Sequence, residues 1–122
     1  MLNKEQILDK LNELELDKNE FVVSMGSSLV MHNIKKETNN INISISSDSF
    51  SRLKQKYNSI YENNIEIIKY DVFEISNLDL NIKKELIDDY YCQDLESIMS
   101  IKKELNRKKD IKDIKAIDVY LC

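Results

Sequence analysis

The chain of 122 residues contains a single glycine, Gly26, and no proline. Glycine adopts positive φ, or lets bare backbone approach a ligand, at the lowest cost, so we expect this chain to do either cheaply at one place only. Gly26 follows the apolar run Phe21–Ser24 and precedes Ser27 and Ser28. The pattern predicts a strand, a turn and a helix, and makes the turn the first candidate for a functional site.

Composition indicates an ordinary globular domain. Hydrophobic residues make up 42% and charged residues 33% of a length that suits one domain over residues 1–122. The formal charge of −4 argues against charge-driven wrapping of nucleic acid, although a local basic cluster could still contact it. Neither a membrane span nor a signal peptide is indicated, so we expect a cytoplasmic protein without a membrane partner. Cys92 and Cys122 lack metal-ligand spacing and are predicted to be free thiols.

Helical and strand periods alternate along the first half of the chain. Asn3 is placed to cap a helix that turns Ile7 and Leu11 to one face. The isoleucines at 41, 43 and 45 alternate with polar residues, which predicts a strand with one face in the core. Further expected elements are a helix over 27–32, a helix from Ser46 or Ser47 to about Tyr57, and one or two strands over 65–69 and 71–75.

The second half is predicted to be mainly helical. We expect a turn over 77–81, and residues 86–91 fit either a strand or a helix. Asp94 precedes an apolar stripe at helical spacing, and Asp110 is placed to cap a last helix after a break at 106–109. These elements predict an α+β domain, with a small mixed sheet flanked by helices and a helical C-terminal half.

Three segments in this order resemble the nucleotidyltransferase superfamily. They are Gly26-Ser27-Ser28, Thr38-Asn39-Asn40-Ile41-Asn42 and Asp71-Val72-Phe73, followed by a basic tail from Lys102. The resemblance is to small bacterial and phage members with a glycine-serine motif, a Thr-x-Asp-x-Asp strand and a third acidic strand. It extends from about Phe21 to Leu121, and it implies a nucleotidyltransferase-like fold for the single domain.

The resemblance implies roles for these positions. A glycine-serine turn at a helix N-terminus offers N–H groups and a hydroxyl to the phosphates of a nucleoside triphosphate, and Gly26, Ser27 and Ser28 match it. Two carboxylates one residue apart on a strand, with a third from a neighbouring strand, hold Mg²⁺ ions, and Asp71 matches the third.

A basic residue on the penultimate helix commonly approaches the triphosphate in this family. Lys102 is the first candidate for that role and Arg107 the second. Pairing with Asp110 or Asp113 is the alternative for Arg107.

The chain departs from the family at Asn40 and Asn42, which stand at the two positions of the carboxylate pair. An amide keeps one carbonyl oxygen but removes the charge, and Mg²⁺ is bound chiefly through carboxylates and substrate phosphates. A site left with Asp71 alone should therefore hold Mg²⁺ poorly and lose catalysis of the parent kind. Asparagine can still donate hydrogen bonds to phosphate oxygens, so nucleotide binding through Asn40 and Asn42 remains compatible with this loss.

The leading interpretation is a catalytically degenerate nucleotidyltransferase-like protein that binds a nucleotide or a macromolecular partner, as small phage-encoded inhibitors of bacterial defence systems do. One alternative is an active enzyme that uses Mg²⁺ and a nucleoside triphosphate to move a nucleotide to an RNA, protein or small-molecule acceptor. It would use Asp71 and Glu74, or have Asn40 and Asn42 as engineered replacements of native aspartates. An antitoxin or adaptor that presents a surface to a helical partner is the other alternative.

Each of these residues also has a purely structural interpretation. Gly26 fits a simple turn, the pair Asn40 and Asn42 fits a solvated strand face, and Asp71 fits an exposed edge strand. The basic residues of the tail, including Lys102 and Arg107, fit a solvated helix face.

Overall fold

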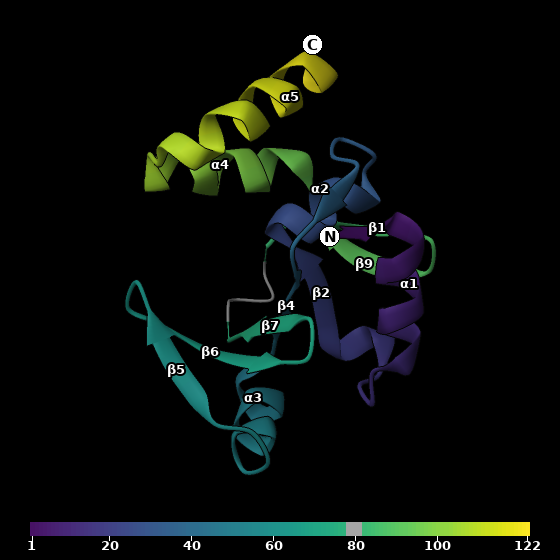
Figure 1. Cartoon of the computed structure of the whole chain (residues 1–122), viewed down its shortest axis with the longest axis vertical. Helices are drawn as coiled ribbons and strands as arrows, with labels where there is room; N and C mark the ends of the chain where they lie inside the picture. The colour runs from purple at the N-terminus through teal and green to yellow at the C-terminus, as the bar shows by residue number, and fades with distance from the viewer. Residues whose placement is uncertain (78–81) are drawn as a thin grey trace.

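A seven-stranded mixed sheet forms the centre of the computed structural model, which describes residues 1–77 and 82–122 (Figure 1). Its strand order is β5-β6-β7-β4-β2-β9-β8. The neighbours β4 and β7 are parallel, as are β2 and β9, while the other neighbouring pairs are antiparallel. The strands are β2 (Phe21–Ser24), β4 (Ile41–Ile45), β5 (Ser59–Glu62), β6 (Ile65–Tyr70), β7 (Phe73–Ser76), β8 (Lys84–Ile87) and β9 (Tyr90–Gln93).

The larger core lies between one face of this sheet and two helices, α1 (Lys4–Glu13) and α3 (Ser47–Lys54). The three isoleucines of β4 are fully buried there, which confirms the predicted alternation along that strand. Ile7 and Leu11 of α1 and Phe50 of α3 belong to the same cluster. The sheet and its helices confirm the expected α+β class.

Helices α1 and α3 begin at the capping residues that the sequence predicts. The Asn3 side chain accepts the backbone N–H of Gln6, and the Gln6 side chain accepts the backbone N–H of Asn3, which completes a capping box. The Ser46 side chain caps α3 by accepting the backbone N–H of Ser49. This helix ends at Lys54, earlier than the expected end near Tyr57.

A second, smaller core joins α2 (Met25–Met31), α4 (Leu95–Leu105) and α5 (Ile111–Leu121). Its buried members are Leu29, Leu95, Ile98 and Ile117. Figure 1 shows α4 and α5 side by side at one end of the molecule, with β5 and β6 toward the other end. Asp94 caps α4 as predicted, and Asn106 ends it in the left-handed conformation with φ 49°.

The prediction that positive φ would be confined to the glycine is wrong. Gly26 has no positive φ, whereas eight other described residues do. All of these except Met25 are asparagine or aspartate, whose short polar side chains tolerate the left-handed region. They are Asn33, Asn63, Asn64, Asp71, Asp88, Asp89 and Asn106. The chain therefore makes its tight turns with asparagine and aspartate.

Several short elements add to those that the sequence predicts. The region over 86–91 is a β-hairpin made by β8 and β9, and β5 pairs with β6 at the opposite edge of the sheet. Two short strands, β1 (Leu2–Asn3) and β3 (Glu37–Thr38), pair with each other apart from the main sheet. Short 3₁₀ helices cover Lys18–Glu20 and Lys108–Asp110. The turn expected over 77–81 falls mainly on residues 78–81, which lie outside the described residues.

None of the helices in the described ranges combines the length and the apolar character that a membrane crossing needs. Cys92 is a buried free thiol and Cys122 an exposed one, as predicted.

Candidate functional site

Two asparagines hold one glutamate on one face of the sheet. Asn40 donates its side-chain amide to Oε1 of Glu74 at 3.0 Å, and Asn42 donates its amide to Oε2 of the same carboxylate at 3.2 Å. Asn42 and Glu74 are direct neighbours in the register of the parallel strands β4 and β7, so their side chains emerge on one face. We call Asn40, Asn42 and Glu74 the Asn–Glu cluster. An ionised carboxylate only accepts hydrogen bonds, so both of its oxygens are matched by donors here.

A lysine from the next strand adds a positive charge to the Asn–Glu cluster. Lys69 of β6 faces Glu74 in the antiparallel register, and its Nζ lies 3.8 Å from Oε1 of Glu74 and 2.8 Å from Oε1 of Glu62. These carboxylates, Glu62 first, raise the pKa of Lys69. Within residues 1–77 and 82–122, no group of three or more His, Cys, Asp and Glu side chains is placed to hold a metal ion.

Asp71, the predicted third acidic residue, does not belong to this cluster. It lies in the turn between β6 and β7 with φ 53°, and its carboxylate accepts a hydrogen bond from the ammonium of Lys10 at 2.9 Å. The structure therefore brings Glu74, rather than Asp71, against the two asparagines. The sequence signal for Glu74 is its place between two buried apolar residues, Phe73 and Ile75, because alternation turns it to the opposite face.

The first residue of α2 is held by a buried glutamine that the sequence analysis did not single out. Met25 has φ 48°, which is unfavourable for a residue with a long side chain, and its backbone N–H donates to Oε1 of Gln93 at 3.1 Å. The Gln93 side chain also donates to the hydroxyl of Ser97 at 3.0 Å, and the residue is 1% exposed. Gln93 therefore fixes the connection between β2 and α2 from the neighbouring strand β9.

Gly26 lies at a close approach to another part of the chain. A Cβ atom at this position would lie 3.3 Å from Oγ1 of Thr38, closer than most side chains tolerate. The glycine therefore lets the start of α2 approach β3 closely, and its backbone φ is ordinary.

The two serines that follow the glycine are fully buried. The Ser27 hydroxyl accepts the backbone N–H of Asn42 at 3.0 Å and donates to the carbonyl of Ser24 at 2.8 Å. The Ser28 hydroxyl donates to the carbonyl of Gln93 at 2.7 Å. The structure thus brings the glycine-serine turn into contact with Asn42, and both hydroxyls bind backbone groups of the sheet. Their contact with a phosphate remains a prediction.

Lys102 and Arg107 form a network that joins α4 to the start of α5. Lys102 is 4% exposed, and its Nζ lies 2.8 Å from Oδ1 of Asp110 and 3.3 Å from Oδ2 of Asp113. Arg107 donates to both carboxylate oxygens of Asp110, at 2.6 and 3.2 Å, which confirms the pairing alternative for this arginine. Burial acts to raise the pKa of Asp110, but hydrogen bonds from Arg107 and Lys102 lower it overall. The predicted contacts of Lys102 and Arg107 with a triphosphate are untested.

Comparisons with protein-family models, with curated proteins and with solved structures found no match for the chain.

Proposed function

We propose that this chain is a nucleotidyltransferase-like domain that has lost metal-dependent catalysis and acts by binding a partner. One observation supports this most directly: the amides of Asn40 and Asn42 bind the two oxygens of Glu74. In the family that the sequence resembles, three carboxylates converge at such a place and need metal ions between them. In this chain one carboxylate is satisfied by two amides.

The charge of the Asn–Glu cluster supports the loss of metal binding. The cluster has one formal negative charge, and Lys69 lies 3.8 Å from it. Binding Mg²⁺ at Glu74 would replace two hydrogen bonds to an ionised group, which are stronger than neutral ones. The ion would gain only one carboxylate, whereas Mg²⁺ sites rely on carboxylates and phosphates.

The order of the elements supports the resemblance to nucleotidyltransferases. Strand β2 leads directly into α2, whose second residue is Gly26. Strand β4 has the asparagine pair, and β7 places an acidic residue beside that pair. The contact between Ser27 and the backbone of Asn42 joins the two segments that the resemblance assigns to one site.

A macromolecular partner is favoured over a nucleotide because the predicted phosphate contacts have internal partners. The hydroxyls of Ser27 and Ser28 bind backbone groups, and the ammonium of Lys102 is buried between two aspartates. Binding a triphosphate through them would break these interactions. An inhibitor of a bacterial defence system encoded by a phage would fit this mode of action, as would an antitoxin or adaptor.

The test compares the wild type with the double variant Asn40→Asp/Asn42→Asp. We expect the wild type to transfer no label from α-labelled nucleoside triphosphates to RNA or protein, with either Mg²⁺ or Mn²⁺. We expect the double variant to gain metal-dependent thermal stabilisation. Asn63→Asp/Asn64→Asp adds the same charge in the exposed β5–β6 turn and should gain none. Metal-dependent transfer by the wild type would overturn the proposal.

A further inference from the structure

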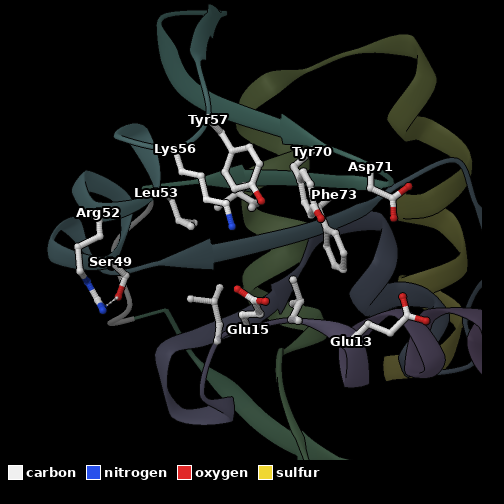
Figure 2. A pocket seen from close by; sticks show the side chains of 13 residues that line it. Glu13, Glu15, Ser49, Arg52, Leu53, Lys56, Tyr57, Tyr70, Asp71 and Phe73 are labelled. Atoms are coloured by element: carbon white, nitrogen blue, oxygen red, sulfur yellow. Dashed lines mark hydrogen bonds between the residues drawn. The ribbon is translucent and has the colours of Figure 1, made fainter.

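A pocket lies on the face of the sheet opposite the Asn–Glu cluster. It has a volume of about 310 Å³ and opens between the end of α1, helix α3 and the β6–β7 hairpin (Figure 2). Phe73 and Ile75 line it, and they alternate along β7 with Glu74, which faces the other way. The volume is at the lower end of the range for ligand pockets, which favours a small ligand.

The middle of the pocket is apolar and aromatic. Leu53 and Phe73 lie along it, and the rings of Tyr57 and Tyr70 form one wall with their centroids 4.5 Å apart. Tyr70 is 42% exposed, so part of its ring surface is open to a ligand. Flat rings are well suited to contact an aromatic wall of this kind, because offset stacking and edge-to-face contact add to the burial of apolar area.

The charged groups at the two ends of the pocket already have partners within the protein. Figure 2 shows Arg52 and Ser49 at one end and Asp71 and Glu13 at the other. Asp71 pairs with Lys10 at 2.9 Å, and Arg52 lies 3.0 Å from the Ser49 hydroxyl and 3.5 Å from Glu20. A ligand with a net charge would compete with these pairs, whereas a neutral ligand would leave them intact.

Two groups of opposite charge approach the middle of the pocket from opposite sides. The ammonium of Lys56 and the carboxylate of Glu15 both lie there in Figure 2. Lys56 is held against the ring of Tyr57, with its Nζ 5.4 Å from the ring centroid. The contact with Tyr57, first, and then the carboxylate of Glu15 raise the pKa of Lys56. The ammonium can donate to a ligand while the carboxylate accepts from it.

We infer that this pocket binds a small, neutral, planar heteroaromatic molecule whose edge has both a hydrogen-bond donor and an acceptor, which is the chemistry of a nucleobase. The aromatic wall favours a flat ligand, and the charges that are already paired within the protein favour a neutral one. Lys56 and Glu15 favour a ligand whose edge has both an acceptor and a donor. The inference stands apart from the proposed function, because the pocket and the Asn–Glu cluster use opposite faces of the sheet.

The test is a titration of the ¹⁵N-labelled full chain with adenine and with uracil, followed by amide chemical shifts. Cyclohexanol, which is not planar, and benzoate, which is charged, serve as comparison ligands. We expect saturable shifts at pocket residues such as Leu53, Lys56 and Tyr70 with at least one base, and weaker binding of both comparison ligands. The absence of saturable pocket shifts with both bases would overturn the inference, as would equal or tighter binding of cyclohexanol or benzoate.

Two variants in the pocket and one control outside it locate the binding. Tyr70→Ala should weaken the binding of the base by about tenfold, because it removes the ring on which the base stacks. Tyr61→Ala removes a tyrosine that is 72% exposed on β5 and should leave the affinity unchanged. Glu15→Gln keeps the shape of an exposed side chain but removes a charged hydrogen-bond acceptor, so it should weaken the binding of the base. If neither Tyr70→Ala nor Glu15→Gln changes the affinity for the base, the assignment of the binding site is wrong.

Discussion

Asn42 donates its side-chain amide to Glu74 across the parallel strands β4 and β7, at 3.2 Å. The two residues are direct neighbours in the register, so the character of one sets the electrostatic environment of the other. A carboxylate at position 42 would face Glu74 with a like charge, and the cluster would then need a proton or a metal ion to be stable.

The substitution Asn42→Asp should therefore destabilise the protein at neutral pH. We expect a loss of about 1–3 kcal/mol in the free energy of unfolding, because a hydrogen bond is replaced by repulsion between carboxylates. The pair should share a proton, so its folded-state pKa rises and the loss should diminish as the pH falls below it. Urea unfolding at several pH values measures this. Asn58→Asp, an exposed site, should show no comparable loss.

The close approach of Gly26 to Thr38 predicts coupling between the two residues. Gly26→Ala should stabilise a Thr38→Ala background by about 0.4–1 kcal/mol, because alanine restricts the unfolded chain and position 26 has no positive φ. In the wild type the gain should be smaller or reversed, since the new Cβ meets Oγ1 of Thr38 at 3.3 Å. A double-mutant cycle from denaturant unfolding gives the coupling energy. Equal effects in both backgrounds would show that the contact does not explain the glycine.

Replacing Gln93 should loosen the turn that begins α2. Gln93→Leu leaves the backbone N–H of Met25 without its acceptor, and a buried unsatisfied donor costs about 1–3 kcal/mol. Hydrogen exchange should show faster exchange of the Met25 amide, with smaller changes in α1. Gln55→Leu changes an exposed glutamine and should leave both stability and exchange near their wild-type values.

The network around Asp110 predicts how stability depends on pH. The folded-state pKa of Asp110 is lowered, so its contribution is fully present above the ordinary aspartate pKa and is lost as the pH falls through the lower folded value. Asp110→Asn should cost about 1–3 kcal/mol at neutral pH, because the buried Lys102 loses its nearer aspartate but keeps Asp113. The difference between the variant and the wild type should shrink in acid. Unfolding curves across the acidic range measure it.

Asp113→Asn is the matched comparison for the Asp110 variant. Asp113 lies farther from Lys102, at 3.3 Å against 2.8 Å, and its side chain is more exposed. We expect a smaller loss of stability from this change. A loss as large as that of Asp110→Asn would show that the two aspartates share the lysine equally.

Local signals were sufficient to predict most elements of the fold. The alternation over Ile41–Ile45 and the caps at Asn3, Ser46 and Asp94 depend on residues within a few positions of one another, and the structure confirms them. Strands β5 and β8 lie at the edges of the sheet and are mostly exposed, so burial imposes little apolar alternation on their sequences.

The site was harder to predict because its decisive contacts are long-range. The sequence analysis favoured Asp71 as the acidic partner of Asn40 and Asn42, and the choice of Glu74 depends on the register between β4 and β7. The role of Gln93 depends on a contact with Met25, 68 residues away in the sequence. Nothing in the local pattern reveals that the hydroxyls of Ser27 and Ser28 are already bound to the sheet.

The buried contact between Gln93 and Met25 also has a consequence for the time course of synthesis. Met25, the strained first residue of α2, finds its hydrogen-bond acceptor in β9. The start of α2, which contains the single glycine, therefore cannot reach its final form until residue 93 has emerged from the ribosome. The pairing of β2 with β9 waits for the same event. Contacts this distant in sequence slow folding, because the intervening loop must close first. The nascent N-terminal half therefore leaves the ribosome with one side of its central strand β2 still unpaired.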